Sequence, residues 1–264
     1  MPRSVRMPVV VTVHDLAWHR VQSHAPPYAR YYFGAFALRR YRTAANVVVD
    51  SEFSRGELLQ LAHGLDPARV HVVYPGVAPE FSSLRREGGD GRTILCVGTV
   101  ERRKNLEVLI RALCNLRAAR LVAVGPLTAY ASDCRALADR LGVTDRVEMP
   151  GYVSRADLLT LYRSAAVAAV PSRYEGFGYA AAQALCAGVP CVVSRCASLP
   201  EVVGTDAPAL DPDDPAAWAA ALDATLHAQA GERVMSARAR ARARFSWESA
   251  GAAMERIYAA SVNR

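Results

Sequence analysis

One acid lies in a glycine-rich turn between an apolar strand and a helix of small residues. The segment "PSRYEGFGYAAAQALCAGVPCVV" spans residues 171–193 and carries Glu175 between the expected strand end and a helix that begins near Gly178. Gln183 follows Glu175 by eight positions, on the inner turns of that helix. Glycines let a ligand approach the backbone, and the amides at a helix start favour anions. Glu175 is therefore expected to lie beside a ligand above the helix end; the alternative is an acid that only stabilises the helix start.

A basic loop follows another expected strand. In "VGTVERRKN" the side chains of Arg102, Arg103 and Lys104 come directly after a buried strand, where a helix begins. Lys104 is the only lysine among the 32 Lys and Arg residues of the chain. A helix N-terminus with Arg103 and Lys104 beside it suits a diphosphate. The alternative is a solvated basic loop at a domain edge, but a single lysine at a strand end favours the anion site.

Both loops need a parallel sheet to position them, because ligands of open α/β sheets lie beyond the carboxyl ends of the strands. Short β-rich runs alternate with helical stretches along the chain, which predicts a doubly wound α/β architecture. Strands are expected at 7–13, 45–50, 68–77, 93–100, 120–125, 146–151, 167–172 and 190–194. Helices are expected at 26–42, 51–64, 104–116, 132–142, 155–165, from about 178, and at 214–229 and 246–261.

The periodicity is interrupted once, where "APEFSSLRREGGDGR" gathers glycine and charge. This interruption predicts an N-terminal Rossmann-like domain over 1–78, a linker over 79–92 and a second domain over 93–245. The helix at 246–264 is expected to pack back toward the N-terminal domain. A Rossmann-type half typically needs about 100–150 residues. The N-terminal domain is therefore expected to be incomplete, without its first strands and helices.

The composition limits the class of protein. Of the 264 residues 52% are hydrophobic, which suffices for one large domain or two modest ones. The net charge of +7 allows nucleic acid, an anionic membrane or phosphorylated ligands as partners. No apolar run could span a bilayer, and "MPRSVRMPVVVTVHD" has too short an apolar core for a signal peptide. A cytoplasmic protein is expected.

Metal and disulfide sites are not predicted. The six cysteines form no C-x-x-C pair and are expected to be reduced, buried thiols. No histidine or cysteine cluster suggests zinc. The segment "DPDD" at 211–214 could be taken for a metal-binding D-x-D, but Pro212 and Pro215 predict a turn into a helix. We therefore expect neither a metal nor another cofactor.

Taken together, these motifs resemble a known family. The run "VGTVERRKNLEVLIRAL…GYVSRADLLTLYRSAAVAAVPSRYEGFG…ALCAGVPCVVS…SLPEVVG…LDPDDPAAWAAAL" is similar to the family 4 retaining glycosyltransferases of GT-B fold. The resemblance runs from about His14 to the C-terminus and is strongest from Gly98 to Pro215. It implies two Rossmann-like domains that face each other across a cleft, the second of which binds a nucleotide-sugar.

The resemblance also implies roles for individual residues. His14 of "VTVHDLAWHR" would lie near the donor's sugar, although a histidine that only caps a strand end is the alternative. Gln183 would contact the ribose, where the family has the second acid of an E-x7-E motif. An amide can still accept a hydrogen bond there, at a cost to donor binding on the order of 1 kcal/mol.

Arg103 and Lys104 would contact the donor diphosphate, and Glu175 the sugar hydroxyls. The expected donor-binding residues are Gly98, Thr99, Arg103, Lys104, Tyr152, Val153, Glu175, Gly176, Phe177, Gly178 and Gln183. The expected catalytic residues are His14, Lys104 and Glu175.

The reaction implied by the resemblance is transfer of a sugar from a nucleoside diphosphate with retained anomeric configuration. Arg103, Lys104 and helix-end amides would stabilise the charge of the departing diphosphate without a metal. Members of that family with a "GT…RKN" loop often use GDP-mannose, so the resemblance favours this donor, and the implied acceptor is a polysaccharide, a lipopolysaccharide or a lipid-linked glycan. One alternative is a donor-binding, catalytically incomplete chain or one half of a two-chain enzyme. Another is an epimerase or phosphorylase of the same fold, whose acid–base residues or cofactor lysine the sequence does not show.

Two basic segments bear on partners. Residues 28–42 interleave tyrosine and phenylalanine with arginine, which suits peripheral contact with the inner face of an anionic membrane. The alternative is that the aromatic face packs on its own sheet. The segment "ARARARARF" at 237–245 lies among helix formers, so its arginines spread around a helix. No nucleic-acid recognition motif accompanies it, and nucleic-acid binding is not expected.

Overall fold

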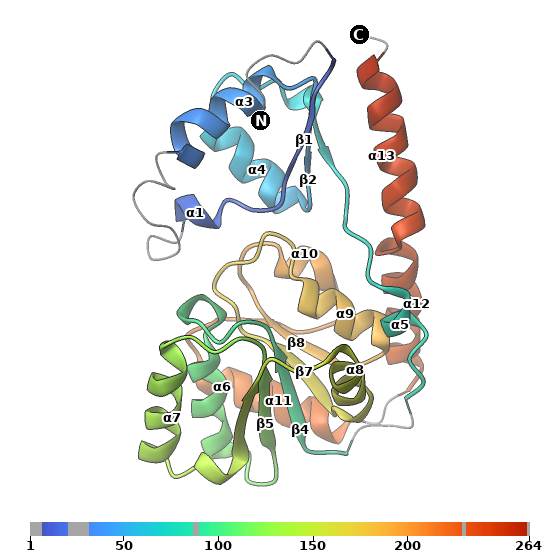
Figure 1. Cartoon of the computed structure of the whole chain (residues 1–264). Helices are drawn as coiled ribbons and strands as arrows, with labels where there is room; N and C mark the ends of the chain where they lie inside the picture. The colour runs from blue at the N-terminus through green and yellow to red at the C-terminus, as the bar shows by residue number, and fades with distance from the viewer. Residues whose placement is uncertain (1–6, 21–31, 87–89, 229–230, 263–264) are drawn as a thin grey trace. The chain divides into compact units, whose positions relative to one another are not determined.

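The computed structural model describes residues 7–20, 32–86, 90–228 and 231–262. They form two units, each of which is drawn from separate stretches of the chain (Figure 1). The N-terminal unit consists of Met1–Gly76, Glu175–Phe177 and Arg244–Arg264. The C-terminal unit consists of Val77–Tyr174 and Gly178–Ala243.

The N-terminal unit is built on a short parallel sheet. Its strands are β1 (Val10–Val13), β2 (Asn46–Val49) and β3 (Val70–Val72), in the order β1-β2-β3. All are rich in valine, whose branched side chain fits the pleated surface. Val13 pairs with Val49, and Val49 with Val72, so the carboxyl ends of the strands lie side by side.

Helices cover both faces of this sheet. They are α1 (Ala17–Arg20), the π-helical turn η1 (Tyr32–Ala37), α3 (Leu38–Thr43), α4 (Glu52–Leu61), the 3-10 turn η2 (Pro67–Arg69) and α13 (Trp247–Val262). Val47 and Val49 of β2 pack in one cluster with Leu58 of α4, whereas Val48 packs on the other face with Ile257 of α13. Because alternate side chains of β2 point to opposite faces of the sheet, Val48 packs against α13, the last helix of the chain (Figure 1). Of the expected helix 26–42, residues 26–31 lie outside the described residues.

The C-terminal unit carries a larger sheet. Its strands are β4 (Thr93–Val97), β5 (Arg120–Val124), β6 (Val147–Gly151), β7 (Val167–Val170), β8 (Cys191–Ser194) and β9 (Ala209–Leu210), all parallel. The order β6-β5-β4-β7-β8-β9 is the 3-2-1-4-5-6 order of dinucleotide-binding folds. The direction of winding reverses between β4 and β7, so ligands are expected beyond the carboxyl ends of these two strands. The doubly wound parallel architecture expected from the sequence is confirmed.

Two layers of helices enclose this sheet. The helices are α5 (Pro79–Ser82), α6 (Leu106–Ala112), α7 (Tyr130–Arg140), α8 (Arg155–Ser164), α9 (Tyr179–Ala187), α10 (Leu199–Val203), α11 (Pro215–His227) and α12 (Glu232–Arg244), with 3-10 turns η3 (Arg102–Lys104), η4 (Leu113–Asn115) and η5 (Thr144–Arg146). Figure 1 shows α6, α7 and α11 on one face and α8, α9 and α10 on the other. Ile94, Leu109 and Trp218 are fully buried in the layer under α6 and α11.

The expected linker contains a short helix, α5, and is held by two arginines. Arg238 of α12 donates to the carbonyl oxygens of Ser82 at 2.8 Å and of Leu84 at 2.6 Å. Arg86 donates to the carbonyl oxygen of Gly188 at 2.6 Å, beyond the end of α9. Cationic side chains are favourable at helix C-termini, which explains why arginine stands at these positions.

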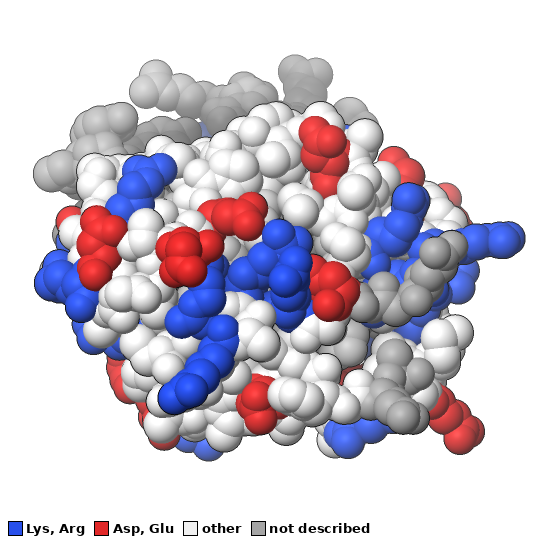
Figure 2. Space-filling model, turned by 90° about the horizontal axis from the view of Figure 1, so that it is seen from below, with Lys and Arg blue, Asp and Glu red and all other residues white. Residues whose placement is uncertain are grey.

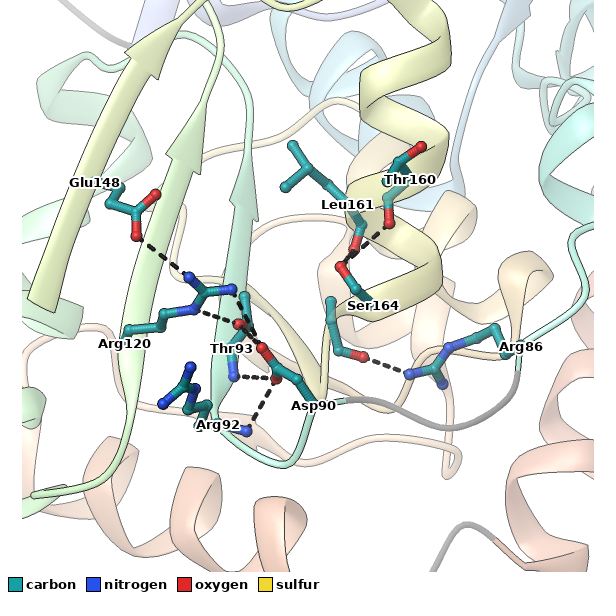
Figure 3. A network of polar contacts seen from close by, with 10 residues as sticks. Arg86, Asp90, Arg92, Thr93, Arg120, Glu148, Thr160, Leu161 and Ser164 are labelled. Carbon is teal, nitrogen blue, oxygen red and sulfur yellow. Dashed lines mark hydrogen bonds and ion pairs between the residues drawn. The ribbon is translucent and has the colours of Figure 1, made fainter.

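The amino edge of the larger sheet is closed by a network around Asp90 (Figure 3). The Asp90 carboxylate accepts from the amides of Arg92 at 3.0 Å and Thr93 at 2.7 Å, and from the Thr93 hydroxyl. Arg120 pairs with Asp90 at 3.2 Å and with Glu148 at 3.4 Å. Burial raises the pKa of Asp90, but the hydrogen bonds and the charge of Arg120 outweigh it, so the pKa lies below its ordinary value.

The surface has mixed charge on the face that Figure 2 shows. Basic and acidic side chains are interspersed there, and basic groups lie against acidic ones. The excess of positive charge is therefore not gathered into one continuous patch on this face. Among the described residues, no helix combines the length and the apolar character needed to cross a bilayer.

Candidate functional site

The loop after β4 is pressed against the end of β5. The amide of Gly98 donates to the carbonyl of Val124 at 2.8 Å, and the amide of Val100 to that of Pro126 at 2.9 Å. Gly125 has φ +147°, and a Cβ on it would lie 2.3 Å from the carbonyl oxygen of Gly98. Only glycine permits this approach, which holds the loop at the carboxyl edge of the sheet.

Lys104 lies across the first residue of this loop. Gly98 has φ +141°, and a Cβ there would come within 3.3 Å of Lys104 Cε and 3.4 Å of Nζ. Lys104 ends the η3 turn and is half-buried, as is Thr99. The charged end of the only lysine therefore lies directly beyond β4, where the fold predicts a ligand.

Arg103 joins the β4 loop to the segment that leads to Glu175. Its guanidinium donates to the carbonyl of Tyr174 at 2.8 Å and pairs with Glu101 at 2.7 Å, and the side chain is 13% exposed. The Arg103 carbonyl accepts from the amide of Arg173 at 2.8 Å. The geometry shows Arg103 holding two loops together; its contact with a diphosphate stays a prediction.

Asn105 connects the loops beyond three strands, and sequence reasoning missed it. The residue is 1% exposed and has φ 55°. Its Nδ2 donates to the carbonyls of Pro212 at 2.8 Å and Pro171 at 3.2 Å. Its Oδ1 accepts from Arg173 at 3.2 Å, and Arg173 in turn grips Asp213 through two nitrogens, at 3.0 and 2.5 Å. The available signal was the residue type, since asparagine tolerates left-handed backbone better than other non-glycine residues.

The expected acid lies on a short segment that belongs to the N-terminal unit, Glu175–Phe177. The carbonyl of Gly176 accepts from the hydroxyls of Ser51 at 2.5 Å and Ser54 at 3.0 Å, both at the start of α4. A Cβ on Gly176 would lie 2.4 Å from the carbonyl oxygen of His14, so glycine is required for this contact. Glu175 itself is 9% exposed.

Phe177 anchors the same segment. Its ring centroid lies 5.4 Å from that of Phe245, at 81°, and 6.2 Å from that of Tyr74. The pair with Phe245 is edge-to-face, and such pairs add about 0.5–1.5 kcal/mol beyond the area that they bury. Phe177 is thus a packing residue here, and its side chain is buried.

The start of α9 follows at Gly178. This residue has φ 91°, and a Cβ on it would lie 2.7 Å from Leu199 Cδ2, which explains the second glycine of the motif. Gln183 is buried, and its Oε1 lies 3.3 Å from the hydroxyl of Tyr162, which can donate to it. The Gln183 side-chain oxygen therefore faces Tyr162 of α8. The contact of Gln183 with a ribose stays a prediction.

His14 pairs with a residue that sequence reasoning did not single out. Its Nδ1 lies 2.8 Å from Asp50 Oδ2, and the side chains are 79% and 12% exposed. Burial raises the pKa of Asp50, the hydrogen bond and charge of His14 lower it, and Asp15 raises it; the pKa ends above its ordinary value. The sequence offered one indication of this pair, because His14 and Asp50 directly follow the valine-rich strands β1 and β2, whose last residues pair with each other.

Tyr152 and Val153 follow β6 at the same edge of the larger sheet. Tyr152 is 81% exposed, whereas Val153 is half-buried. The contact of these two residues with a donor stays a prediction.

The "DPDD" segment forms a helix start. Asp211 accepts from the amide of Asp213 at 2.8 Å, and Asp214 caps α11 by accepting from the amides of Ala216 and Ala217, both at 3.0 Å. In the described part of the chain, no three histidine, cysteine or acidic residues are grouped as a metal site would need. All six cysteines are free thiols.

Comparison with known proteins agrees with these motifs. The model of the family "Glycosyl transferases group 1" matches residues 91–228, and that of "Glycosyltransferase Family 4" matches residues 2–81. The D-inositol 3-phosphate glycosyltransferase of Xylanimonas cellulosilytica is 34% identical over 98% of this chain and 67% of its own length. The protein of that name from Mycobacterium tuberculosis is 33% identical over 83% of this chain and 49% of its own. The chain thus spans about half the length of the mycobacterial relative.

Solved structures share the fold. Alr3699/HepE of Anabaena, in complex with UDP and glucose, superimposes with a TM-score of 0.78 at 22% identity, over 94% of this chain and 70% of its own. WaaG, a glycosyltransferase involved in lipopolysaccharide biosynthesis, superimposes with a TM-score of 0.77 at 18% identity, over 95% of this chain and 75% of its own. The expected GT-B architecture is confirmed. Two family models match this chain, and a relative is 34% identical to it over 98% of the chain, so this chain belongs to the group 1 (family 4) glycosyltransferases.

Proposed function

We propose that the protein transfers a sugar from a nucleoside-diphosphate sugar to an acceptor hydroxyl, with retention of the anomeric configuration. The observation that carries the proposal is the convergence of two loops at the switch point of the larger sheet. The loop after β4 brings Lys104, and the loop after β7 leads into Glu175. Asn105 fastens the two loops to each other.

The charges at this edge suit the departing group. When the bond between the anomeric carbon and the diphosphate oxygen breaks, negative charge develops on the diphosphate. The ammonium group of Lys104 can stabilise that charge without reorganisation, because Gly98 and the η3 turn already hold it beyond β4. Glu175 is proposed to orient the sugar hydroxyls, and His14 to contact the sugar. The reaction as proposed uses no metal.

The donor and the acceptor are proposed as classes. The sequence favours GDP-mannose, whereas the similar Anabaena structure holds UDP and glucose, so both bases need testing. The similar curated proteins are named for D-inositol 3-phosphate, and WaaG is named for lipopolysaccharide. The acceptor is proposed to be a hydroxyl of a polysaccharide, a lipid-linked glycan or an inositol phosphate.

Calorimetric titration tests the donor site. The chain is titrated with UDP, GDP and ADP and then with UDP-glucose and GDP-mannose. Lys104→Ala should abolish the binding of the nucleoside diphosphate, and Glu175→Ala should weaken only the sugar conjugate. Arg117→Ala is the control. The substitution removes one positive charge, as Lys104→Ala does, but Arg117 is exposed and lies just before the amino end of β5. If every nucleotide fails to bind the unaltered chain, the proposal is wrong.

A second candidate function is donor binding without transfer by this chain alone. The observation that favours it is the length of the mycobacterial relative, of which the chain spans 49%. The two functions are separated by incubating the chain with the bound donor and candidate acceptors, and following the anomeric signals by NMR. A product with the donor's anomeric configuration supports the transferase; binding without product supports the second candidate.

Peripheral membrane contact is proposed for the N-terminal unit. Arg39 and Arg42 of α3 are exposed, and Phe36 is partly exposed beneath the guanidinium of Arg40, 5.1 Å from its ring centroid. Flotation with vesicles that contain anionic lipid should recover the chain, and the double variant R39E/R42E should stay in solution. Vesicles of neutral lipid are the control. Equal recovery of both proteins would contradict the contact.

A further inference from the structure

The register of the smaller sheet places a carboxylate beside the exposed histidine. Val13 of β1 pairs with Val49 of β2, and each strand ends at that residue. The next residues, His14 and Asp50, therefore emerge next to each other, and Nδ1 of the ring lies 2.8 Å from Oδ2 of the carboxylate. Asp50 is shielded, with 12% of its side chain exposed, whereas 79% of the His14 side chain is open to a ligand.

This contact decides what the imidazole can offer. An ionised carboxylate accepts hydrogen bonds only, so the ring must carry its proton on Nδ1 and donate it to Asp50. The second nitrogen, Nε2, is then the one on the open side of the ring. In the neutral ring Nε2 is an acceptor, and it can receive a hydrogen bond from a hydroxyl group.

The residue after Asp50 holds the acid segment. Ser51 caps α4 by accepting from the amide of Ser54 at 3.0 Å, and its hydroxyl donates to the carbonyl of Gly176 at 2.5 Å. Gly176 also packs against the backbone of His14, where there is no room for a Cβ. The dipeptide Asp50–Ser51 therefore holds both the His14 ring and the backbone next to Glu175.

We propose that Asp50 is a positioning residue that holds the His14 ring in the Nδ1–H form, so that Nε2 accepts a hydrogen bond from a hydroxyl of the donor's sugar. The inference rests on the proposed function for the identity of the ligand. The proton position itself is a property of the free protein, and it can be tested without any ligand.

Long-range ¹H–¹⁵N NMR correlation spectra of the imidazole nitrogens at about pH 8 provide that test. His14→Gln assigns the His14 signals among those of the six histidines. In the unaltered chain, Nδ1 should show the shift of a protonated nitrogen and Nε2 that of an unprotonated one. Asp50→Ala should move the proton toward Nε2. Asp15→Asn is the control, because it removes the neighbouring charge but leaves the contact between His14 and Asp50.

Three results would overturn the proposal: an unprotonated Nδ1 in the unaltered chain, an unchanged proton position in Asp50→Ala, or the same change in Asp15→Asn. The signals of the other histidines report whether each variant is folded, and Asp50→Asn, of equal volume, replaces Asp50→Ala if that variant unfolds. Its amide can donate to Nδ1, which again predicts a shift of the proton toward Nε2.

A second readout uses the donor. With a donor that the titrations identify, Asp50→Ala should lower kcat by about tenfold with KM changed less, which is the lower end of the loss seen when a metal-bound histidine loses its orienting partner. An unchanged kcat with a shifted proton would overturn the role toward the sugar. Failure of every nucleotide to bind would refute the proposed function and leave the NMR result intact.

Discussion

The side chain of Lys104 crosses the backbone of Gly98, so that a Cβ at position 98 would come within 3.3 Å of Lys104 Cε. Lys104 can lie at the end of β4 because the residue six positions earlier is a glycine, which leaves space for the lysine side chain. The glycine is thus part of the proposed anion site, although it supplies no charge.

Gly98→Ala should weaken nucleotide binding without any change in charge. The added methyl group displaces Lys104, and φ +141° is strained for alanine. We expect the affinity for the preferred nucleoside diphosphate to fall about tenfold, which corresponds to the loss of one charge-assisted contact. Gly142→Ala is the control, because φ there is +65° and nothing lies within 4 Å of the added Cβ. Equal affinity in both variants, measured by calorimetry, would refute the role of Gly98.

The single lysine allows a direct observation of the site. Reductive methylation with ¹³C-formaldehyde keeps the charge and labels Lys104 together with the N-terminal amine. The Lys104 methyl signal should shift when UDP or GDP is added, because the diphosphate comes into contact with the ammonium group. Free glucose or mannose should leave it unchanged. A signal that no nucleotide moves would place the diphosphate elsewhere.

Asn105→Ala should destabilise the C-terminal unit and weaken donor binding together. The substitution leaves the buried carbonyl of Pro171 and the partly buried carbonyl of Pro212 without their donor, and it puts alanine at φ 55°. We expect a loss of about 2–4 kcal/mol in the free energy of unfolding. Asn105→Gly removes the backbone strain and should lose less. Urea denaturation measures both, with the exposed Asn115→Ala as control. If Asn105→Ala unfolds at the same urea concentration as the control, Asn105 does not fasten the loops.

The stabilising effect of Asp90 should depend on pH. Its folded-state pKa lies below the ordinary value, so its contribution is fully present above the unfolded-state pKa, about 4, and is lost as pH falls through the folded-state pKa. Because the carboxylate is partly exposed, we expect Asp90→Asn to cost no more than about 1 kcal/mol at pH 7. The difference from the unaltered chain should shrink as the pH falls below about 4 and disappear once Asp90 is protonated in the folded state. Urea denaturation at a series of pH values from 7 downward measures it, with the exposed Asp145→Asn as control. A difference that persists in acid would show that the charge of Asp90 is not the cause.

Gln183→Glu should lower the stability of the folded chain and raise its affinity for the donor. A carboxylate in this buried position would cost about 1–3 kcal/mol of stability, in spite of the Tyr162 hydroxyl that can donate to it. If position 183 faces the ribose, the charge should raise donor affinity severalfold, by about 1 kcal/mol. Urea denaturation and nucleotide titration at pH 8 test the two effects separately. The exposed Gln60→Glu is the control. Lower stability without a gain in affinity would show that Gln183 only packs against Tyr162.

Much of the fold and part of the candidate site could be predicted from local patterns. Valine-rich runs such as Val10–Val13 and small-residue helices such as Tyr179–Ala187 depend on periodicity that is readable over a few residues. Lys104 and Glu175 could be chosen because both follow apolar strands, and the carboxyl ends of parallel strands share one edge.

The contacts that complete the site could not be predicted in this way. His14 and Asp50 are 36 residues apart, and Asn105 and Pro212 are 107 apart. Whether such pairs meet depends on strand register and on the paths of loops, which no local pattern encodes. The assignment of Glu175–Phe177 to the N-terminal unit likewise rests on packing against residues distant in sequence.

The sequence by itself therefore determined the parallel α/β architecture, because periodicity is a local property of the chain, and it indicated the family through the resemblance of its motifs. Only the tertiary structure decided that Asn105 fastens the loops, that Asp50 faces His14 and that Gly98 makes room for Lys104. These are relations between distant backbone positions, and they exist only once the strands have paired and the core has packed.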